Sequence, residues 1–147
     1  MRTAEISVEI EKPATDVYNH VVDSDHITTW VTKDDSLVHG LDGPIEVGST
    51  FSVESPGNET DRRRFKYEIV ALEPGDMVAI KTAGRLLTYT ARRTFNGSTA
   101  VTVVKEVIEM EDPPGLARLL GGFMMGRIKR THQKSLQELK TSLEGSA

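Results

Sequence analysis

An alternation of apolar and polar residues through the middle of the chain most constrains what this sequence can fold into. In the stretch RRRFKYEIVAL, the aromatic and apolar residues Phe65, Tyr67 and Ile69 are separated by Lys66 and Glu68. Successive side chains point to opposite faces of a β-strand. The period of two therefore predicts a strand with one buried face.

Similar stretches follow one another between residues 32 and 112, and short turn sequences separate them. The sequence EPGD (residues 73–76) is typical of a tight turn, and Asn96-Gly97 suits the two left-handed positions of a type I′ hairpin turn. Consecutive strands joined by tight turns predict an antiparallel sheet rather than a parallel one.

Helices are predicted on both sides of this run of strands. The chain begins with a further alternating stretch, ISVEIE, and Pro13 then opens the first of two short helices, with the second in SDHITTWV. After DPPG (residues 112–115), one long helix is predicted to the C-terminal end. A large sheet needs a cover on one face, and only this last helix is long enough. We therefore expect an α+β fold in one domain (residues 1–147), a curved antiparallel sheet of about six to seven strands around a long C-terminal helix.

The long C-terminal segment carries glycines where it is most apolar. Its first apolar cluster, around Leu119 and Phe123, and its second, around Ile128 and Leu136, are centred about 150° apart on a helical wheel. One straight helix cannot turn both clusters to one sheet, so a kink or break is expected within residues 121–126. The alternative is that the glycines let the helix pack closely and that the methionines fill an irregular core.

Composition excludes several classes of function. The net charge of −4 does not favour binding to nucleic acid or to an anionic membrane through bulk electrostatics. The chain has no cysteine, which excludes disulfides, thiolate metal sites and cysteine nucleophiles. It also has no signal-peptide pattern and no run of about 20 apolar residues. A cytoplasmic protein without stable membrane insertion is expected, either a monomer or a homodimer.

The histidines do not form a recognisable catalytic or metal motif. His20 and His26 lie near Asp23 and Asp25, but a spacing of six does not place two histidines on one helical face. His132 lies in KRTHQK and is expected on a solvated helix face. Neither a zinc motif nor a nucleophile elbow nor a phosphate-binding loop is present. We assign no catalytic residue, metal ligand or cofactor from the sequence.

Two arginines, Arg63 and Arg93, share the parity of apolar strand residues, and one of them is expected to point into the predicted core. Arg63 lies near the end of its strand, where solvation is expected, so Arg93 is the candidate. Arg93 shares strand parity with Tyr89 and Phe95, so its side chain faces the same side as theirs. Two roles are open for an inward arginine. It can anchor a carboxylate or enolate oxygen of a ligand, or it can form an ion pair with Glu106 or Glu109 on the neighbouring strand.

The ordered segments ISVEIEKPATDVYNHVVD, DHITTWV, YEIVALEPGDMVAIKT and RRTFNGSTAVTVV, followed by the long helix, resemble the START-like superfamily. This superfamily is also called SRPBCC or Bet v 1-like, and the chain is most similar to its small bacterial polyketide cyclase/dehydrase-type proteins. The resemblance implies the helix-grip fold. It also implies a cavity between sheet and helix that holds a small apolar molecule or a lipid.

Three functions follow from this resemblance and from the residues. The first is binding or transport of a small hydrophobic or lipid-like molecule, and its expected contacts are Trp30, Phe51, Tyr67, Tyr89, Arg93, Phe123, Met124 and Ile128. The second is a polyketide aromatase/cyclase or dehydratase, for which Tyr89, Arg93 and Glu106 are the candidate acids and bases. The third is a partner-regulating module, such as a chaperone cofactor or a toxin-like protein, with a filled core and an exposed apolar patch.

Overall fold

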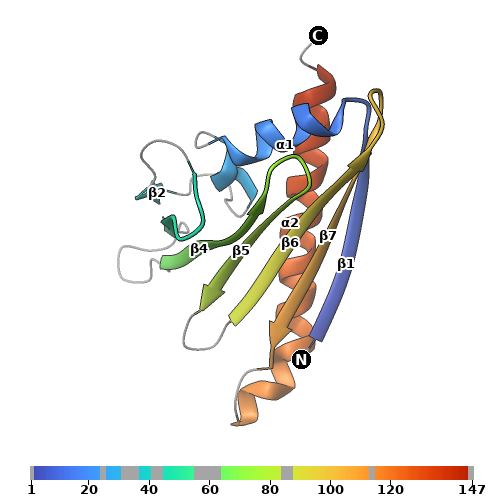
Figure 1. Ribbon diagram of the computed structural model, residues 1–147. Coiled ribbons are helices and arrows are strands. Elements are labelled where there is room, and N and C mark those ends of the chain that lie inside the picture. The colour runs from blue at the N-terminus through green and yellow to red at the C-terminus, as the bar shows by residue number, and fades with distance from the viewer. Residues whose placement is uncertain are drawn as a thin grey trace.

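A seven-stranded antiparallel sheet dominates the part of the chain that the computed structural model describes, which comprises residues 2–23, 26–30, 37–40, 45–54, 64–83, 88–112 and 115–145 (Figure 1). The strands lie in the order β1-β7-β6-β5-β4-β3-β2. Their bounds are β1 (Arg2–Ile10), β2 (Leu37–His39), β3 (Thr50–Glu54), β4 (Arg64–Glu73), β5 (Met77–Ala83), β6 (Thr88–Gly97) and β7 (Thr102–Glu111). The first strand therefore pairs with the last one, and the middle strands follow one another as a meander.

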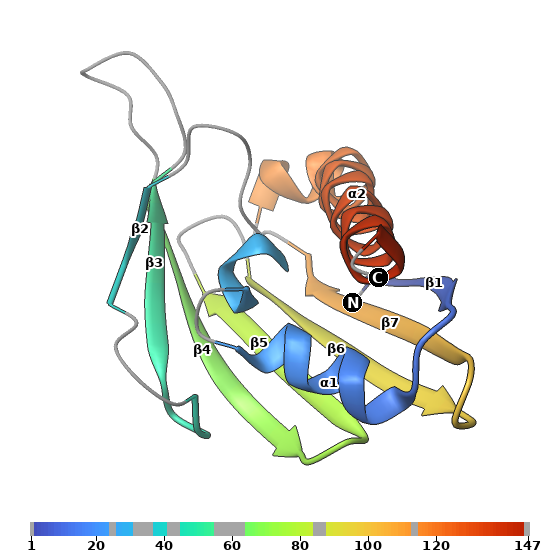
Figure 2. The same ribbon diagram turned by 90° about the horizontal axis from the view of Figure 1, so that it is seen from above.

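The helices lie against the concave face of this sheet. Two short helices follow β1, namely α1 (Ala14–Val22) and the 3₁₀ helix η1 (Ile27–Trp30). A second 3₁₀ helix, η2 (Gly115–Leu120), leads directly into the long helix α2 (Gly121–Gly145). Figure 2, which looks nearly along α2, shows the sheet curving around it. The predicted helix-grip architecture is confirmed, including the two short helices after the first strand.

Burial follows strand parity, as the alternating sequence requires. On β7, Thr102, Val104, Glu106, Ile108 and Met110 are buried and the residues between them are exposed or half-buried. The inward side chains meet those of α2, where Met125, Ile128, Leu136, Leu139 and Leu143 belong to the same core. None of the described helices is long and apolar enough to cross a membrane.

The break predicted in the C-terminal segment lies at the first residue of the expected interval. The helix changes from 3₁₀ to α between Leu120 and Gly121, and α2 then continues through Gly126. A Cβ atom on Gly121 would lie 2.6 Å from Nε of Arg2 and 2.9 Å from Oδ1 of Asp112, so this glycine leaves room for a side-chain ion pair. Leu119 of the first apolar cluster is exposed, which shows that this cluster does not pack against the sheet. The break therefore does not turn both clusters to the sheet.

The β6–β7 hairpin differs from the predicted two-residue turn. Asn96 pairs with Val103 and Gly97 with Thr102, so the turn is the four-residue loop 98–101. The Asn-Gly pair thus extends β6 instead of closing the hairpin. Gly97 is needed there for space, since a Cβ atom would lie 2.5 Å from the carbonyl oxygen of Val101.

Candidate functional site

His132 lies inside the molecule, on the face of α2 that packs against the sheet. Only 1% of its surface is exposed, and Ile128 and Leu136, one turn away on either side, are buried with it. The expectation that His132 is solvated is therefore wrong. Spacings of four residues keep side chains on one helical face, so the turn-by-turn series from Ile128 places the imidazole in the core.

A carboxylate and a guanidinium meet the imidazole in the core. Glu106 and Arg93 are directly opposite on β7 and β6, and both face inward. Arg93 Nε lies 2.5 Å from Oε1 of Glu106, and its Nη2 donates to Oγ of Ser135 at 3.0 Å. The guanidinium carbon also lies 4.3 Å from the centre of the Trp30 ring. The ion pair with Glu106, one of the two roles open for Arg93, is present.

The distances around Glu106 place the hydrogen atoms. Nδ1 of His132 lies 2.6 Å from Oε2 of Glu106, and the indole nitrogen of Trp30 lies 2.7 Å from Oε1 and 3.0 Å from Nδ1. A carboxylate only accepts, so Nδ1 carries its hydrogen toward Oε2 and cannot also accept from the indole. The Trp30 N–H therefore donates to Oε1. With this hydrogen on Nδ1, the other ring nitrogen, Nε2, faces the hydroxyl of Tyr89 at 3.2 Å.

Aromatic side chains continue this polar chain along the concave face. Tyr67 lies next to Tyr89, and their ring centres are 6.5 Å apart in an edge-to-face arrangement. Phe51 stacks on Tyr67 at 5.3 Å. Strand register explains the row, because Phe51 is paired with Tyr67, Tyr67 with Thr82, and Thr82 with Tyr89. We call Trp30, Tyr89, Arg93, Glu106, His132 and Ser135 the polar cluster.

The electrostatics of the polar cluster favour an ionised carboxylate and a neutral phenol. Burial alone would raise the pKa of Glu106, but Arg93 and then His132 outweigh it and hold that pKa below its ordinary value. Burial raises the pKa of Tyr89 well above its ordinary value, and the neighbouring Tyr67 and Glu106 raise it further. Burial lowers the pKa of Arg93, and Glu106 opposes that shift.

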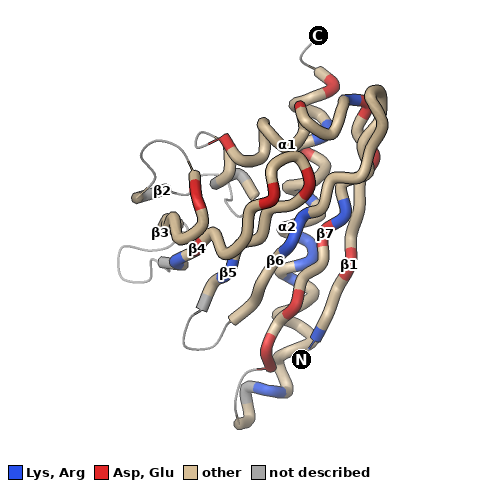
Figure 3. Tube along the Cα trace, viewed as in Figure 1, with Lys and Arg blue, Asp and Glu red and all other residues tan. Residues whose placement is uncertain are grey.

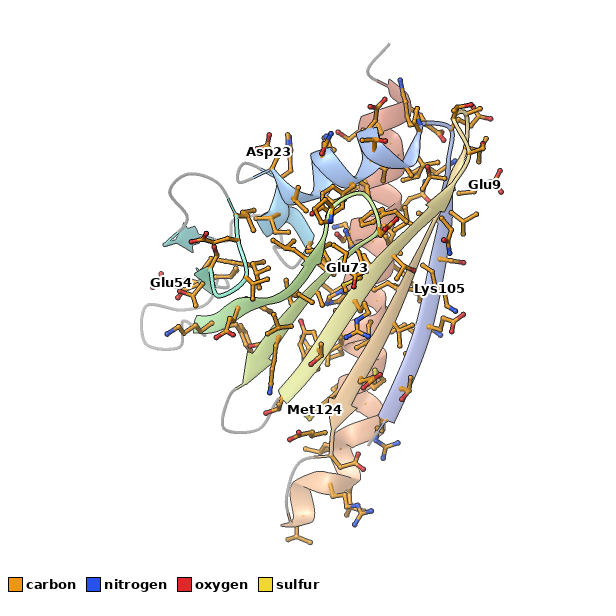
Figure 4. All side chains as sticks on the ribbon, viewed as in Figure 1. Glu9, Asp23, Glu54, Glu73, Lys105 and Met124 are labelled. Carbon is orange, nitrogen blue, oxygen red and sulfur yellow. The ribbon has the colours of Figure 1, made fainter. Side chains whose placement is uncertain are left out.

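The structure brings together many of the residues named from sequence. Trp30, Tyr89 and Arg93 belong to the polar cluster, and Phe51 and Tyr67 adjoin it. Ile128 is buried on α2, and Met124, labelled in Figure 4, is half-buried against the core. Phe123 lies apart, with 63% of its side chain exposed.

Two members of the polar cluster were missed as site residues, His132 and Ser135. Their helical spacing from Ile128 was a usable signal, but three cationic neighbours of His132 suggested a solvated face. No group of three or more metal-ligating side chains occurs within the described ranges. The arrangement can orient an oxygen function of a ligand through the Tyr89 hydroxyl and offers the imidazole of His132 as a proton acceptor.

Comparisons with solved structures agree with the fold. Ara h 8.0201 has a TM-score of 0.77 at 12% identity, with 99% of each chain covered. Norcoclaurine synthase from Thalictrum flavum, in complex with dopamine and hydroxybenzaldehyde, has a TM-score of 0.70 at 11% identity and covers 99% of this chain and 88% of that chain. DynU16, from the dynemicin biosynthetic locus, has a TM-score of 0.61 at 16% identity over 96% of this chain and 48% of that one. Identities this low show a shared fold alone.

Comparison at the level of sequence gives the family. No curated protein sequence matches the chain significantly. The family model described as polyketide cyclase / dehydrase and lipid transport matches residues 1–144, which is nearly the whole chain. The protein with this buried carboxylate, imidazole and phenol between sheet and helix therefore belongs to the polyketide cyclase / dehydrase and lipid transport family.

Proposed function

We propose that the protein binds a small, largely apolar molecule bearing a hydroxyl or carbonyl group, between the concave face of the sheet and α2. One observation carries this proposal: the imidazole of His132 lies between the carboxylate of Glu106 and the hydroxyl of Tyr89, at 2.6 and 3.2 Å. The three side chains are at most 4% exposed. Membership in a family named for cyclases and lipid transport supports the same conclusion.

The energetic cost of the polar cluster supports a functional role for it. A buried ion pair is often no more stabilising than apolar side chains of the same volume, because both charges lose their hydration. An apolar packing of α2 against β6 and β7 would thus hold the fold at least as well. Buried titratable groups with shifted pKa values are concentrated at sites that bind or react.

Each side chain has a distinct role in this proposal. The hydroxyls of Tyr67 and Tyr89 contact the oxygen of the ligand, and Phe51, Met124 and Ile128 contact its apolar body. Arg93 and Trp30 act indirectly, because both bond to Glu106 and thereby fix His132. The proposal gives Phe123 no contact with this ligand, since its side chain lies outside the core.

Paired probes test the binding proposal. We expect 2-naphthol and naphthalene to displace the dye anilinonaphthalene sulfonate from the protein. Tyr89→Phe removes one hydrogen bond, so it should weaken 2-naphthol about 5- to 10-fold and leave naphthalene unchanged. Val103→Ser, at an exposed position of β7, is the matched control. An equal loss of affinity for both probes in Tyr89→Phe, or no displacement of the dye by either probe, would contradict the proposal. Native mass spectrometry of freshly purified protein checks separately for a retained small molecule.

The same geometry favours acid–base catalysis as a second candidate function. A ligand carbonyl that takes the hydrogen bond of the Tyr89 hydroxyl would free Nε2 of His132 to accept a proton from the carbon next to that carbonyl. The carbonyl oxygen then becomes an enolate oxygen, to which Tyr89 donates. Glu106 stabilises the imidazolium formed, because it accepts from Nδ1.

Deuterium exchange into benzoylacetone tests this second function. The protein should accelerate exchange at the carbon between the two carbonyls, and NMR follows the loss of that proton signal. His132→Gln should abolish the acceleration, whereas Lys134→Gln, on the exposed face of α2, should keep it. Equal rates for the two variants would rule out catalysis by His132 and leave the binding proposal standing.

A further inference from the structure

Four large apolar side chains protrude from one end of the molecule. Leu116, Leu119 and Leu120 on η2 are 86%, 83% and 56% exposed, and Phe123 on the first turn of α2 is 63% exposed. Figure 1 shows η2 beyond the ends of β1 and β7, at the opposite end from the C-terminus. We call these four residues the apolar tip. Contiguous exposed apolar side chains of this size mark a contact surface.

The charge around the apolar tip is opposite to that of the rest of the chain. Residues 113–137 contain five Lys or Arg and no Asp or Glu. The chain has 18 basic and 22 acidic residues, so the remainder holds 13 basic and 22 acidic ones, a net charge of −9. Arg118, Arg127 and Arg130 are exposed, and the guanidinium of Arg127 lies 5.9 Å from the centre of the Phe123 ring.

The two signs of charge lie on different sides of the structure. Glu109 and Glu111 alternate with the buried residues of β7 and therefore face the convex side of the sheet, away from α2. The basic residues lie on η2 and α2, on the concave side. Figure 3 shows blue along η2 and α2 and red along the lower part of β7. A surface approached with η2 foremost meets apolar and basic side chains together.

We propose that η2 and the first two turns of α2 dock on an anionic lipid bilayer. This inference rests on the exposed side chains and does not depend on the ligand proposed above. Apolar side chains enter the boundary between headgroups and acyl chains, and neighbouring arginines bind lipid phosphates. The apolar tip lies on η2 and the first turn of α2, beyond the ends of β1 and β7, so its side chains are placed to enter a soft bilayer surface. The binding is peripheral, since α2 is anchored in the sheet by its other face.

Co-sedimentation with vesicles tests the docking. We expect the protein to pellet with vesicles of phosphatidylcholine containing about one third phosphatidylserine, and weakly with phosphatidylcholine alone. Leu116→Ser with Leu119→Ser should lower the affinity at least about 10-fold, because both side chains leave water on binding. Arg118→Gln with Arg127→Gln should lower it about 25-fold, roughly 5-fold for each charge. Added salt should weaken the binding of the parent protein.

Control variants at exposed apolar positions outside the apolar tip test whether the effect on vesicle binding is specific to it. Val47→Ser and Val103→Ser remove exposed apolar side chains elsewhere and should leave vesicle binding unchanged. Thermal unfolding confirms that every variant is folded, which is expected because all the substituted side chains are exposed. Absence of pelleting, equal binding to both vesicle types, or equal loss in the control variants overturns the proposal. A dimer seen by light scattering and lost in the Leu116/Leu119 variant also overturns it, in favour of a second copy of this chain.

Discussion

Glu106 Oε2 lies 2.6 Å from Nδ1 of His132, although the two residues come from β7 and α2. The other oxygen of this carboxylate accepts from Arg93 and from the indole of Trp30. One side chain thus links η1, β6, β7 and α2. The carboxylate is buried completely, so its negative charge is stabilised by Arg93, Trp30 and His132 instead of by water. Substitutions around Glu106 should therefore be strongly coupled.

A double-mutant cycle measures the coupling between Arg93 and Glu106. Arg93→Met or Glu106→Leu alone leaves an uncompensated buried charge and should lower the free energy of unfolding by about 3–5 kcal/mol. The double variant should cost clearly less than the sum, because neither charge remains. Urea unfolding followed by circular dichroism gives the four values. Strict additivity would show that the two charges do not stabilise each other.

Acid should destabilise the protein through Glu106. The pKa of Glu106 is lower in the folded state than its ordinary value of 4.5. On acidification the unfolded chain therefore takes up this proton first, so stability is retained above pH about 4.5 and falls as the pH drops toward the folded pKa. The slope of the unfolding free energy below pH about 4.5 should shrink in Glu106→Gln. It should be unchanged in Glu68→Gln, at an exposed position of β4.

Alkali should destabilise the protein through Tyr89. Its pKa is well above the ordinary value of 10.0 in the folded state, chiefly because of burial. The unfolded chain loses this proton first as the pH rises, so stability is retained below pH about 10 and declines above it. Tyr89→Phe removes the hydroxyl and should flatten this decline. Thermal unfolding at a series of pH values measures stability in the parent protein and in Tyr89→Phe. If stability falls equally in both above pH about 10, the decline does not come from Tyr89.

Two glycines should respond in opposite directions to alanine. A Cβ atom on Gly126, inside α2, meets no atom within 4 Å, so Gly126→Ala should stabilise the protein by about 0.5–1 kcal/mol through helix propensity. A Cβ atom on Gly97 would lie 2.5 Å from the Val101 carbonyl oxygen and 2.8 Å from Cα of Thr102. These are backbone atoms, so Gly97→Ala should be destabilising. Melting temperatures check both signs, and a stable Gly97→Ala would mean that the β6–β7 loop adapts.

Local periodicity was sufficient to predict most of the fold. Strand alternation, turn sequences and the long C-terminal helix depend on neighbours within a few residues. The β6–β7 turn was misplaced because Asn-Gly is compatible with a tight hairpin, whereas register across the pair decides where the turn falls. The helix break was expected because two apolar clusters have different phases. The cluster around Leu119 and Phe123 is exposed because η2 extends beyond the ends of β1 and β7, and helical periodicity does not predict where the sheet ends.

The candidate site was less accessible from the sequence. Strand parity predicted that Arg93 lies on the inner face of the sheet. The pairing of neighbouring strands suggested Glu106 as its partner, and the structure pairs the two residues. His132 lies on α2, 26 positions beyond Glu106 in the sequence. Their contact depends on how α2 packs on the sheet, which local periodicity does not predict. Lys129, Arg130 and Lys134 flank His132 in sequence and lie elsewhere on the helix surface. The expected cytoplasmic location and oligomeric state remain predictions.

The pairing of β1 with β7 has a consequence for how the chain folds during synthesis. β1 stands at one edge of the sheet, and its hydrogen-bonded neighbour is the last strand, with Arg2 paired to Met110 and Ile10 to Thr102. A nascent chain therefore exposes its first strand, without a partner, until β7 has left the ribosome. Contacts this distant in sequence slow folding and extend exposure to aggregation. The alternating glutamates of β1 keep the waiting strand polar on one face.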